Sequence, residues 1–416
     1  MKGFQGQFEP DPRISREVGA LEGLRIIDMG QIWAGPLCAN LLGDMGAEVV
    51  RVETRGRAAM SGRPEFGEKD ALENAASYYL RNRLCLSADL SYSEGRDLVR
   101  DLVRISDVLI ENFSPRALPS WGLDYKNLCK VNPSIILLSL SAAGQTGPWS
   151  QRITQGPTLS ALYGRASLIG YPGEEWPRAD TAEGDPLAAS FGVIALMAAL
   201  FHRDRTGEGQ HIDLAQGEAM LALDAEAVLD YTMNGRVKGF QGNNSTTMSP
   251  HGIYPCKGDD QWVAISVESD DQWEKFCQLI VSSPWLQDDR LKVTEGRILA
   301  VNELDIAISE WTSSHDPWSI TRMMQSSGIP AYPVLNARGQ LEDPHLRYRR
   351  AYLIRQETSL DLDELTFTNP WKLNATPPSI RRVTPSIGQD NELILYDMLG
   401  RTPQEVALLE ELGVLV

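Results

Sequence analysis

Two short apolar runs near the start of the chain are separated by a glycine-containing turn and a segment of helical length. The runs are Leu24–Met29 and Glu48–Glu53, and each has the length and composition of a strand. Between them, Pro36 suits the first turn of a helix and Gly46 suits the position just past its end. Strand, turn, helix and strand within about thirty residues predict a βαβ unit, whose two strands are parallel.

The same alternation continues along the chain. A helical pattern over Ser91–Val108 leads into the apolar run Val108–Ile110, and a short helix over Tyr125–Val131 precedes a further apolar run, Ile135–Leu140. Helices that alternate with strands of this kind predict a doubly wound α/β domain built on a parallel sheet.

Later segments indicate where this domain ends. Pro186–His202 is small and apolar, which predicts a buried helix too short to span a membrane, and Arg203–Gly209 predicts a turn after it. After Asn234 the chain becomes polar and rich in turn residues, which indicates a domain boundary. The segments that follow suit a smaller α+β domain, and the C-terminal helices are expected to pack back on the first domain.

The charge of the chain argues against several classes of partner. Lys and Arg number 39 against 56 Asp and Glu, so the net charge is −17 and the pI is near 4.8. A surface this acidic repels phosphate backbones and anionic lipids, so we expect no nucleic acid and no membrane as partners. An anionic ligand would need a local basic pocket.

The compartment and the metal content follow from simple patterns. The start of the chain has no apolar signal core, and no apolar run approaches the ~20 residues that span a bilayer, so we expect a cytoplasmic protein. The five cysteines are scattered and never form a C-x-x-C pair. The five histidines show no H-E-x-x-H spacing. We therefore expect neither a disulfide scaffold nor a metal site.

The common cofactor and hydrolase motifs are absent from the sequence. Gly30–Gly35 is not a G-x-G-x-x-G motif, and Trp33 stands where a pyrophosphate would require a small residue. Neither the P-loop motif nor the G-x-S-x-G nucleophile motif occurs. These observations argue against a dinucleotide site, a P-loop NTPase and an α/β-hydrolase.

With these motifs excluded, the remaining candidate for a catalytic group is the carboxylate of Asp185. Glu183–Pro186 predicts a tight turn directly before the apolar helix. Asp185 in this turn suits a helix cap, which is a purely structural role. A carboxylate held beside apolar walls also suits a desolvated nucleophile, and sequence spacing alone does not decide between the two.

Several blocks of the chain occur in the same order in a known family. They are Leu21–Glu53, Asn82–Asp89, Ser106–Pro115, Asn132–Pro148, Glu183–Pro186, His202–Leu214 and Gly328–Asn336. On these blocks the chain resembles the family III CoA-transferases, which include formyl-CoA transferase, the carnitine CoA-transferases and the α-methylacyl-CoA racemases. The resemblance extends from about Leu21 to Val416.

The resemblance implies an architecture. Both chain ends, residues 1–233 and 341–416, are expected to form a large Rossmann-like CoA-binding domain, and residues 234–340 a small α+β domain. In this family two chains interlock like rings, with the active site near the junctions of domains and subunits. We therefore expect a homodimer, or a heteromer with a related subunit.

The resemblance also implies a reaction and a nucleophile. Enzymes of this family, of the EC 2.8.3 type, move CoA from an acyl-CoA to a free carboxylic acid. Asp185 matches the family's catalytic aspartate, which forms a mixed anhydride with the acyl group and then an aspartyl-CoA thioester. CoA and acyl-CoA are then substrates, and no tightly bound cofactor is expected.

Further site residues are carried over from the family's blocks. Asn112 is expected to line the CoA site, and the loop Gly242–Pro250 stands where formyl-CoA transferase has a mobile glycine run. The residues expected to bind CoA phosphates are Arg51 and Arg83, for which a solvated surface charge is the alternative, and those expected at the acyl pocket are Trp33, Gln155 and Gly184.

Two alternatives stay open at this point. An α-methylacyl-CoA racemase uses a histidine as a base, and Gln155 occupies that position here. Because glutamine does not act as a base near neutral pH, transfer is favoured over racemisation. The chain could also be a silent subunit of a heteromer, although a silent subunit has no need to keep Asp185.

Overall fold

The computed structural model describes residues 19–54, 79–175, 183–280, 285, 287–357 and 362–415, with the backbone alone described at 354–357 and 362–365. It divides into two compact units. Unit 1 comprises Met1–Arg165, Ala179–Leu229 and Arg350–Val416, and unit 2 comprises Ala166–Arg178 and Asp230–Arg349. The sequence predicts domain limits at 233/234 and 340/341, whereas the units change at 229/230 and 349/350, and 166–178 belongs to unit 2.

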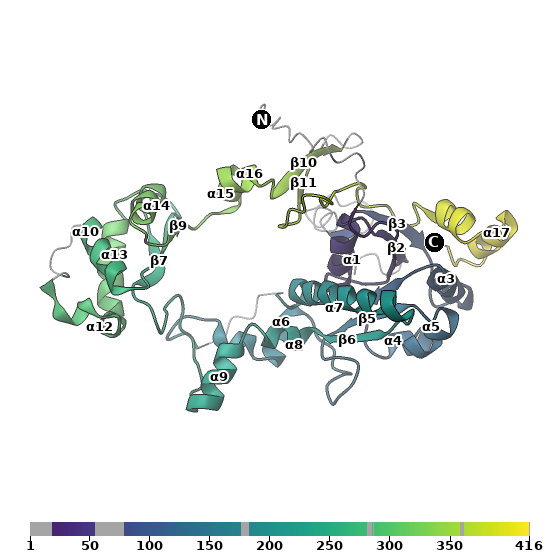
Figure 1. Cartoon of the computed structure of the whole chain (residues 1–416), viewed down its shortest axis with the longest axis horizontal. Coiled ribbons are helices and arrows are strands. Elements are labelled where there is room, and N and C mark those ends of the chain that lie inside the picture. Colours follow the sequence, from purple (N-terminus) through teal and green to yellow (C-terminus); the bar gives the residue numbers. More distant parts are fainter. Residues whose placement is uncertain are drawn as a thin grey trace. The chain divides into compact units, whose positions relative to one another are not determined.

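A six-stranded sheet with the order β3-β2-β1-β4-β5-β6 forms the centre of unit 1 (Figure 1). Its strands are β1 (Arg25–Asp28), β2 (Glu48–Glu53), β3 (Arg83–Ser87), β4 (Val108–Glu111), β5 (Ile136–Ser141) and β6 (His211–Ala215). All neighbours pair in parallel, which confirms the predicted α/β fold. The order reverses between β1 and β4, and the carboxyl ends of strands at such a switch point are where doubly wound folds bind ligands.

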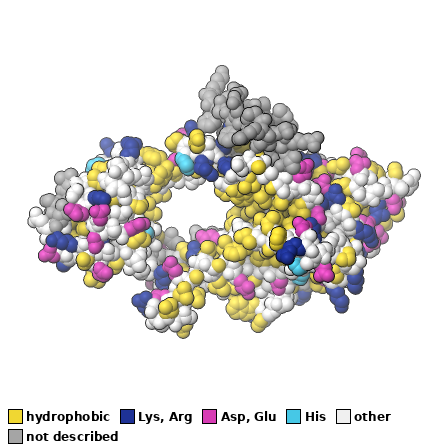
Figure 2. All heavy atoms as spheres, in the orientation of Figure 1, with side chains coloured by type: hydrophobic (Ala, Val, Ile, Leu, Met, Phe, Trp, Pro, Cys, Tyr) yellow, Lys and Arg dark blue, Asp and Glu magenta, His cyan; other side chains and the backbone are white. Residues whose placement is uncertain are grey.

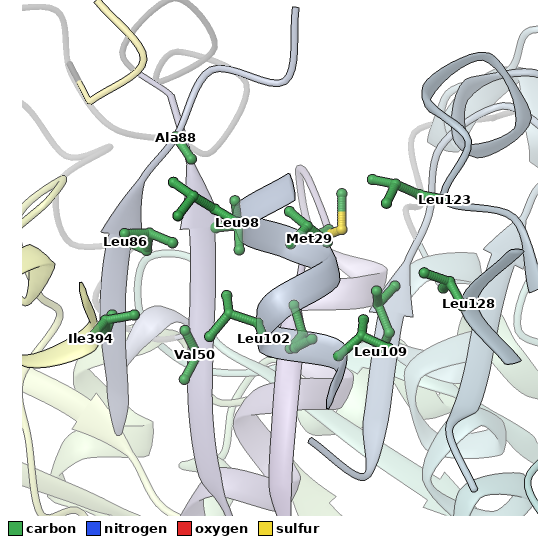
Figure 3. Close-up of a cluster of buried hydrophobic side chains, with 14 of the residues drawn as sticks. Met29, Val50, Leu86, Ala88, Leu98, Leu102, Leu109, Leu123, Leu128 and Ile394 are labelled. Atoms are coloured by element: carbon green, nitrogen blue, oxygen red, sulfur yellow. The ribbon is translucent and has the colours of Figure 1, made fainter. Parts of the chain in front are cut away.

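The strands are apolar along most of their length because both faces of the sheet are covered. Side chains alternate between the faces, so Ile27 lies in one hydrophobic cluster and its neighbour Ile26 in the other. Figure 3 shows the first cluster, where Leu98 and Leu102 of α3 (Ser93–Arg104) lie against strand residues such as Val50. The helices α5 (Tyr125–Val131) and α17 (Pro403–Glu411) add to this cluster.

The opposite face of the sheet is covered by α1 (Ala34–Asp44) and α7 (Gly184–Thr206). A glycine permits their close packing, because a Cβ on Gly192 of α7 would lie 3.2 Å from Cys38 Sγ of α1 and 3.2 Å from Leu138 Cδ2 of β5. The first β-strand, α1 and β2 together form the βαβ unit predicted from the opening of the sequence.

Helix α7 corrects the prediction for its region. It continues through Arg203–Thr206, where the sequence predicts a turn, and ends at Gly207, whose φ of 79° suits glycine. Only one face is buried: Phe191, Ile194 and Phe201 are exposed, and Figure 2 shows apolar side chains gathered over α7. The helix has 23 residues, and an 18-residue window of it has a mean hydropathy of 1.7, so by length and composition it could cross a membrane, contrary to the prediction. One face of it packs on the sheet of unit 1, and a single helix of this length and composition is weak evidence for a membrane span.

The C-terminal segment belongs to unit 1. It contains the antiparallel hairpin of β10 (Tyr352–Glu357) and β11 (Leu362–Phe367), the π-helix η4 (Leu393–Met398) and α17. Asn82 binds this segment: its side-chain Oδ1 accepts from the N–H groups of Arg381 (2.6 Å) and Arg382 (2.9 Å). The Asn82 amide also donates to Ser379 O at 2.8 Å. The Asn82 side chain therefore connects the C-terminal segment to the first half of the chain.

Unit 2 contains a three-stranded antiparallel sheet of β7 (His251–Pro255), β8 (Trp262–Ser266) and β9 (Ala331–Pro333). Its core combines these strands with α10 (Asp270–Leu279), α13 (Val301–Thr312) and α14 (Pro317–Ser326). Among the described residues, the remaining helices are α4 (Ala117–Trp121), α6 (Gly156–Leu162), η2 (Arg165–Leu168), α8 (Gln216–Leu221), α9 (Ala225–Asn234), η3 (Asp289–Lys292), α12 (Thr294–Leu299), α15 (Ala337–Glu342) and α16 (Pro344–Tyr348).

Candidate active site

The carboxylate of Asp185 lies at the amino end of α1. Helix α1 has Trp33 at its N-cap, and this residue makes no side-chain capping bond. The Ala34 N–H in the first turn instead faces the Asp185 side chain, which comes from a different helix, and lowers the pKa of that carboxyl group. A carboxylate is a favourable partner for the orphan N–H groups of a helix amino end.

Asp185 is not the N-cap of its own helix, so the purely structural alternative is wrong in that form. Helix α7 begins at Gly184, its N-cap is Glu183, and Asp185 lies inside the first turn. Its carboxylate is therefore close to the amino ends of two helices, α7 and α1, and both helix dipoles favour the ionised form. The side chain acts across the fold rather than along its own helix.

The environment of Asp185 suits a reactive carboxylate. The residue is half-buried, and burial raises the pKa of its carboxyl group while the Ala34 N–H lowers it, with a net increase. Partial removal from water makes a carboxylate a better nucleophile, and partial exposure leaves it open to a substrate.

Gly184 packs the amino end of α7 tightly against its neighbours. A Cβ at this position would lie 2.8 Å from Leu159 Cδ2 of α6 and 2.9 Å from Met220 Sδ of α8. The glycine therefore sets how close Asp185 can come to the protein interior. Its predicted place in the substrate pocket stays a prediction.

The loop between β1 and α1 approaches Asp185 through Ala34. Trp33 in this loop is half-buried, and its Nε1 has no hydrogen-bond partner within the part of the chain that the structure describes. Asn112, at the end of β4, binds the same loop: its Oδ1 accepts from Gln31 N at 2.6 Å and its Nδ2 donates to Gln31 O at 2.8 Å. The expected contact of Asn112 with CoA stays a prediction, because both ends of its amide are engaged with Gln31.

Arg51 and Arg83 are not surface charges. Each is only 1% exposed, and both guanidinium groups contact Asp28 Oδ2, at 3.0 Å from Arg51 Nη1 and 3.3 Å from Arg83 Nε. Arg51 is also paired with Glu53 (3.2 Å). These contacts link β1, β2 and β3 inside the sheet, so the surface-charge alternative is wrong for both arginines.

The two arginines differ in protonation and in position. Burial lowers the pKa of Arg51, but the carboxylates of Glu53 and Asp28 raise it further, with a net increase. Burial lowers the pKa of Arg83 to about 10, against the effect of Asp28. Arg83 also donates to the carbonyl oxygens of Tyr79 (2.5 Å) and Pro36. Its predicted contact with CoA phosphates stays a prediction.

A pocket opens at the carboxyl ends of the strands beside the switch point. Its lining includes Gly30 and Gln31 after β1, Arg51 and Glu53 of β2, and Phe113 after β4. Trp121 also lines the pocket and meets Phe113 edge-on, with ring centroids 5.2 Å apart. An apolar wall with a few polar groups at the switch point is the usual form of a ligand site in this type of fold.

One other predicted residue, Gln155, and one predicted loop are not among the residues that line the pocket. Gln155 is exposed and forms the N-cap of α6, where its N–H donates to Thr158 Oγ1 at 2.8 Å. The loop Gly242–Pro250 lies in unit 2, whereas Asp185 lies in unit 1. Their roles at the pocket and as a lid stay predictions.

Sequence reasoning missed several residues of the site. Asp28, Glu53 and Glu111 each end a strand of the sheet, which is a signal that the sequence did offer. Burial raises the pKa of Glu111 to about 7, against hydrogen bonds from Ser139 and from the Phe113 N–H. The role of Ala34 gave no signal, because a backbone N–H belongs to every residue except proline. In the described part of the chain, no three His, Cys, Asp or Glu side chains are grouped as metal ligands.

Comparisons of the sequence and the fold with known proteins lead to one family. The model of CoA-transferase family III matches residues 21–391. Succinyl-CoA–D-citramalate CoA-transferase of Chloroflexus aurantiacus is 32% identical over 395 residues, which cover 94% of this chain and 96% of that one. The alpha subunit of succinyl-CoA–L-malate CoA-transferase of Chloroflexus aurantiacus is 32% identical over 405 residues, with coverages of 95% and 92%.

A solved structure agrees with the sequence matches. The crystal structure of a CAIB/BAIF family protein from Brucella suis superposes with a TM-score of 0.82 and 26% identity, covering 92% of this chain and 100% of that one. Fold, near-complete sequence coverage and the family model all agree. The chain therefore belongs to CoA-transferase family III and is a CoA-transferase.

Proposed function

We propose that this CoA-transferase moves CoA from an acyl-CoA donor to a free carboxylic acid with Asp185 as a covalent nucleophile. The observation that carries the proposal is the half-buried carboxylate of Asp185, which lies beside the Ala34 N–H at the amino end of α1. The carboxylate has a raised pKa and no arginine or lysine as a described partner, so it is available to attack.

The reaction proceeds in balanced steps. An Asp185 oxygen attacks the thioester carbonyl of the donor, and CoA leaves as the thiolate, which gives a mixed anhydride. The thiolate then attacks the Asp185 carbonyl, which forms an aspartyl-CoA thioester and releases the donor acid. The acceptor carboxylate attacks this thioester, and the two steps run in reverse to give the new acyl-CoA and free Asp185.

The fold places a hydrogen-bond donor near the Asp185 oxygen on which negative charge develops during the reaction. When thiolate or acceptor attacks the Asp185 carbonyl, a tetrahedral intermediate carries negative charge on the side-chain oxygen. The Ala34 N–H, already directed at this side chain, donates to that oxygen without reorganisation. Apolar packing around Gly184 limits the access of water, which would otherwise hydrolyse the anhydride.

The CoA moiety is assigned to the pocket beside the switch point. Arg51 forms part of its lining and Phe113 and Trp121 form its apolar wall. Because Arg51 is balanced by Asp28 and Glu53, it contributes a positive group in a nearly neutral cluster rather than a free cation. The lining includes Arg51 and not Arg83, so it supports Arg51 as a CoA-binding residue better than Arg83.

Succinyl-CoA is the donor that we propose, with a dicarboxylic acid as acceptor. The support is that both relatives named above carry succinyl-CoA in their names and are 32% identical to this chain over nearly its whole length. The reaction needs no tightly bound cofactor, because CoA enters and leaves as part of the substrates.

The assembly forms a further part of the proposal. The exposed apolar residues Phe191, Ile194 and Phe201 of α7 suit burial against another chain. A second copy, interlocked with the first, or a related subunit would cover them; one relative is an alpha subunit, which supports a multimer. We propose a cytoplasmic location for this assembly.

The covalent adduct provides the decisive test. The enzyme is incubated with succinyl-CoA, quenched with hydroxylamine and digested, and the peptides are analysed by mass spectrometry. A hydroxamate on Asp185 is expected. Glu183→Gln, which alters a carboxylate in the same turn, serves as the matched control and should keep both the adduct and the transfer activity.

Two results would overturn the proposal. If Asp185→Asn transferred CoA at the wild-type rate, Asp185 would not be the nucleophile. If no adduct formed and deuterium from solvent entered the α-carbon of a CoA ester instead, the enzyme would be of the racemase type. Activity that appeared only after a second polypeptide was added would indicate a subunit of a heteromer.

A further inference from the structure

The loop between β1 and α1, which ends at Ala34, is fixed by hydrogen bonds at most of its residues. Gly30 N donates to Asp28 Oδ1 at 2.8 Å, and Gly30 O accepts from Arg51 Nη1 at 3.0 Å. Trp33 O accepts the first helical bond of α1, from Leu37 N at 2.8 Å. Both ends of the loop are thus fixed to the sheet or to the helix.

Asn112 fixes the middle of the loop from a different strand. Its amide oxygen accepts from Gln31 N at 2.6 Å and its amide nitrogen donates to Gln31 O at 2.8 Å. Asn112 is itself held, because Glu111 Oε2 accepts from the Phe113 N–H at 2.7 Å on the other side of it. A two-bond contact of this kind fixes the peptide groups on both sides of Gln31.

The next residue along the loop is strained. Ile32 has a φ of +61°, in the left-handed region that β-branched side chains strongly avoid. The other non-glycine residues with positive φ in the described chain are Asn82, Asp260 and Arg350, none of which is β-branched. The Ile32 side chain is 48% exposed, so its own packing provides little reason for this conformation.

The strain lies between two contacts that matter for the proposed nucleophile. Asn112 binds the residue before Ile32, and the Asp185 carboxylate faces the N–H of Ala34, two residues after Ile32. A change of φ at Ile32 therefore rotates the peptide groups that aim the Ala34 N–H. Gly35 permits the close approach of Asn112, because a Cβ there would lie 3.3 Å from Asn112 Oδ1.

We propose that Asn112 is a positioning residue, which holds Ile32 in its left-handed conformation and so keeps the Ala34 N–H aimed at Asp185. The inference rests on the proposed function of Asp185. It assigns Asn112 an effect on the chemical step, exerted through the loop, that is separate from any contact with CoA.

Asn112→Ala tests the proposal, with kcat and KM measured separately and as functions of pH. We expect kcat to fall by about 100-fold because the N–H is misplaced, while KM changes little. The apparent pKa of the acidic limb of the profile should rise, because the N–H that favours the ionised form of Asp185 moves away from it. Loss of CoA binding alone would raise KM and leave that limb in place.

A second substitution separates positioning from a general structural role. Glycine adopts a positive φ without strain, so Ile32→Gly added to Asn112→Ala should recover at least about tenfold in kcat. Ile32→Ala is the matched control: it removes the same β-branched side chain but keeps a Cβ, and should rescue far less. Equal rescue by glycine and alanine, or none by either, overturns the proposal.

The outcomes also separate this proposal from the one on which it rests. If Asp185→Asn is inactive and Asn112→Ala has the kcat and pH profile of the wild type, only the positioning role fails. If Asp185→Asn is active, the nucleophile itself fails. Should Asn112→Ala not fold, Asn112→Asp, which keeps the acceptor for Gln31 N and loses the donor, takes its place with the same rescue criterion.

Discussion

Asp28 and Asp185 are two carboxylates of unit 1 that differ in how completely their oxygens are used. Asp28 is fully buried and contacts Gly30 N, Arg51 and Arg83. Asp185 is half-buried, and its described partner is a single backbone N–H, that of Ala34. A carboxylate saturated by cations contributes to the structure, whereas one with free lone pairs and partial desolvation is available for chemistry.

Asp185→Asn should separate the two carboxylates most strongly. We expect turnover to fall by about 10⁴-fold or more, because the nucleophile is lost. Stability should change little, since the amide oxygen still accepts from Ala34 N–H and a desolvated charge is removed. The measurements are steady-state transfer and urea unfolding of the same preparation. A large loss of stability would assign Asp185 the structural role of Asp28.

Asp28→Asn should have the opposite effect. It removes the charge that faces two buried guanidinium groups, and breaking a buried pair in this way costs about 3–5 kcal/mol in the free energy of unfolding. Urea unfolding of wild type and variant measures the difference. Arg25→Gln, which removes a partly exposed pair with Glu48, is the control and should cost well under half as much. Equal costs would show that burial of the Asp28 cluster is unimportant.

Glu111 tests whether a buried acid without a cation costs stability. Its folded-state pKa is about 7, raised from 4.5, so between these pH values the folded state binds more protons than the unfolded state. Stability from this group is present below pH 4.5 and is lost as the pH rises through 7, by up to about 3 kcal/mol.

Glu111→Gln should remove that dependence. The variant should gain stability over the wild type at pH 8 and lose the advantage near pH 4.5, as measured by urea unfolding across the range. If the free energy of unfolding of the wild type instead rose relative to that of Glu111→Gln between pH 5 and 7, the raised pKa of Glu111 would be contradicted.

Gly184→Ala should have the smallest effect on stability. The added Cβ meets Leu159 Cδ2 and Met220 Sδ, which are ends of flexible side chains, so we expect a loss of about 1–2 kcal/mol. Because Asp185 is the next residue, kcat should fall more than the stability loss alone explains. Unchanged kcat with reduced stability would show that the position of α7 does not control Asp185.

Much of the fold could be predicted from local patterns. The βαβ unit at Leu24–Glu53 and the alternation that follows depend on strand-length apolar runs and helix punctuation, which act over a few residues. The composition of Arg203–Gly209 predicts a turn, whereas α7 continues to Thr206 and ends at Gly207. The blocks shared with a family pointed to Asp185 and to CoA transfer, and the comparisons confirmed the family.

The sequence by itself therefore determined the parallel α/β architecture, the family and the candidate nucleophile, since each depends on residues close together in the chain or in a recognisable order. Only the tertiary structure decided that Arg51 and Arg83 are buried against Asp28, that Asp185 binds the amino end of α1, and that Asn112 holds the loop before a strained Ile32. The physical reason is that burial, pairing and backbone strain are properties of contacts between distant segments, and no local pattern of residue types records them.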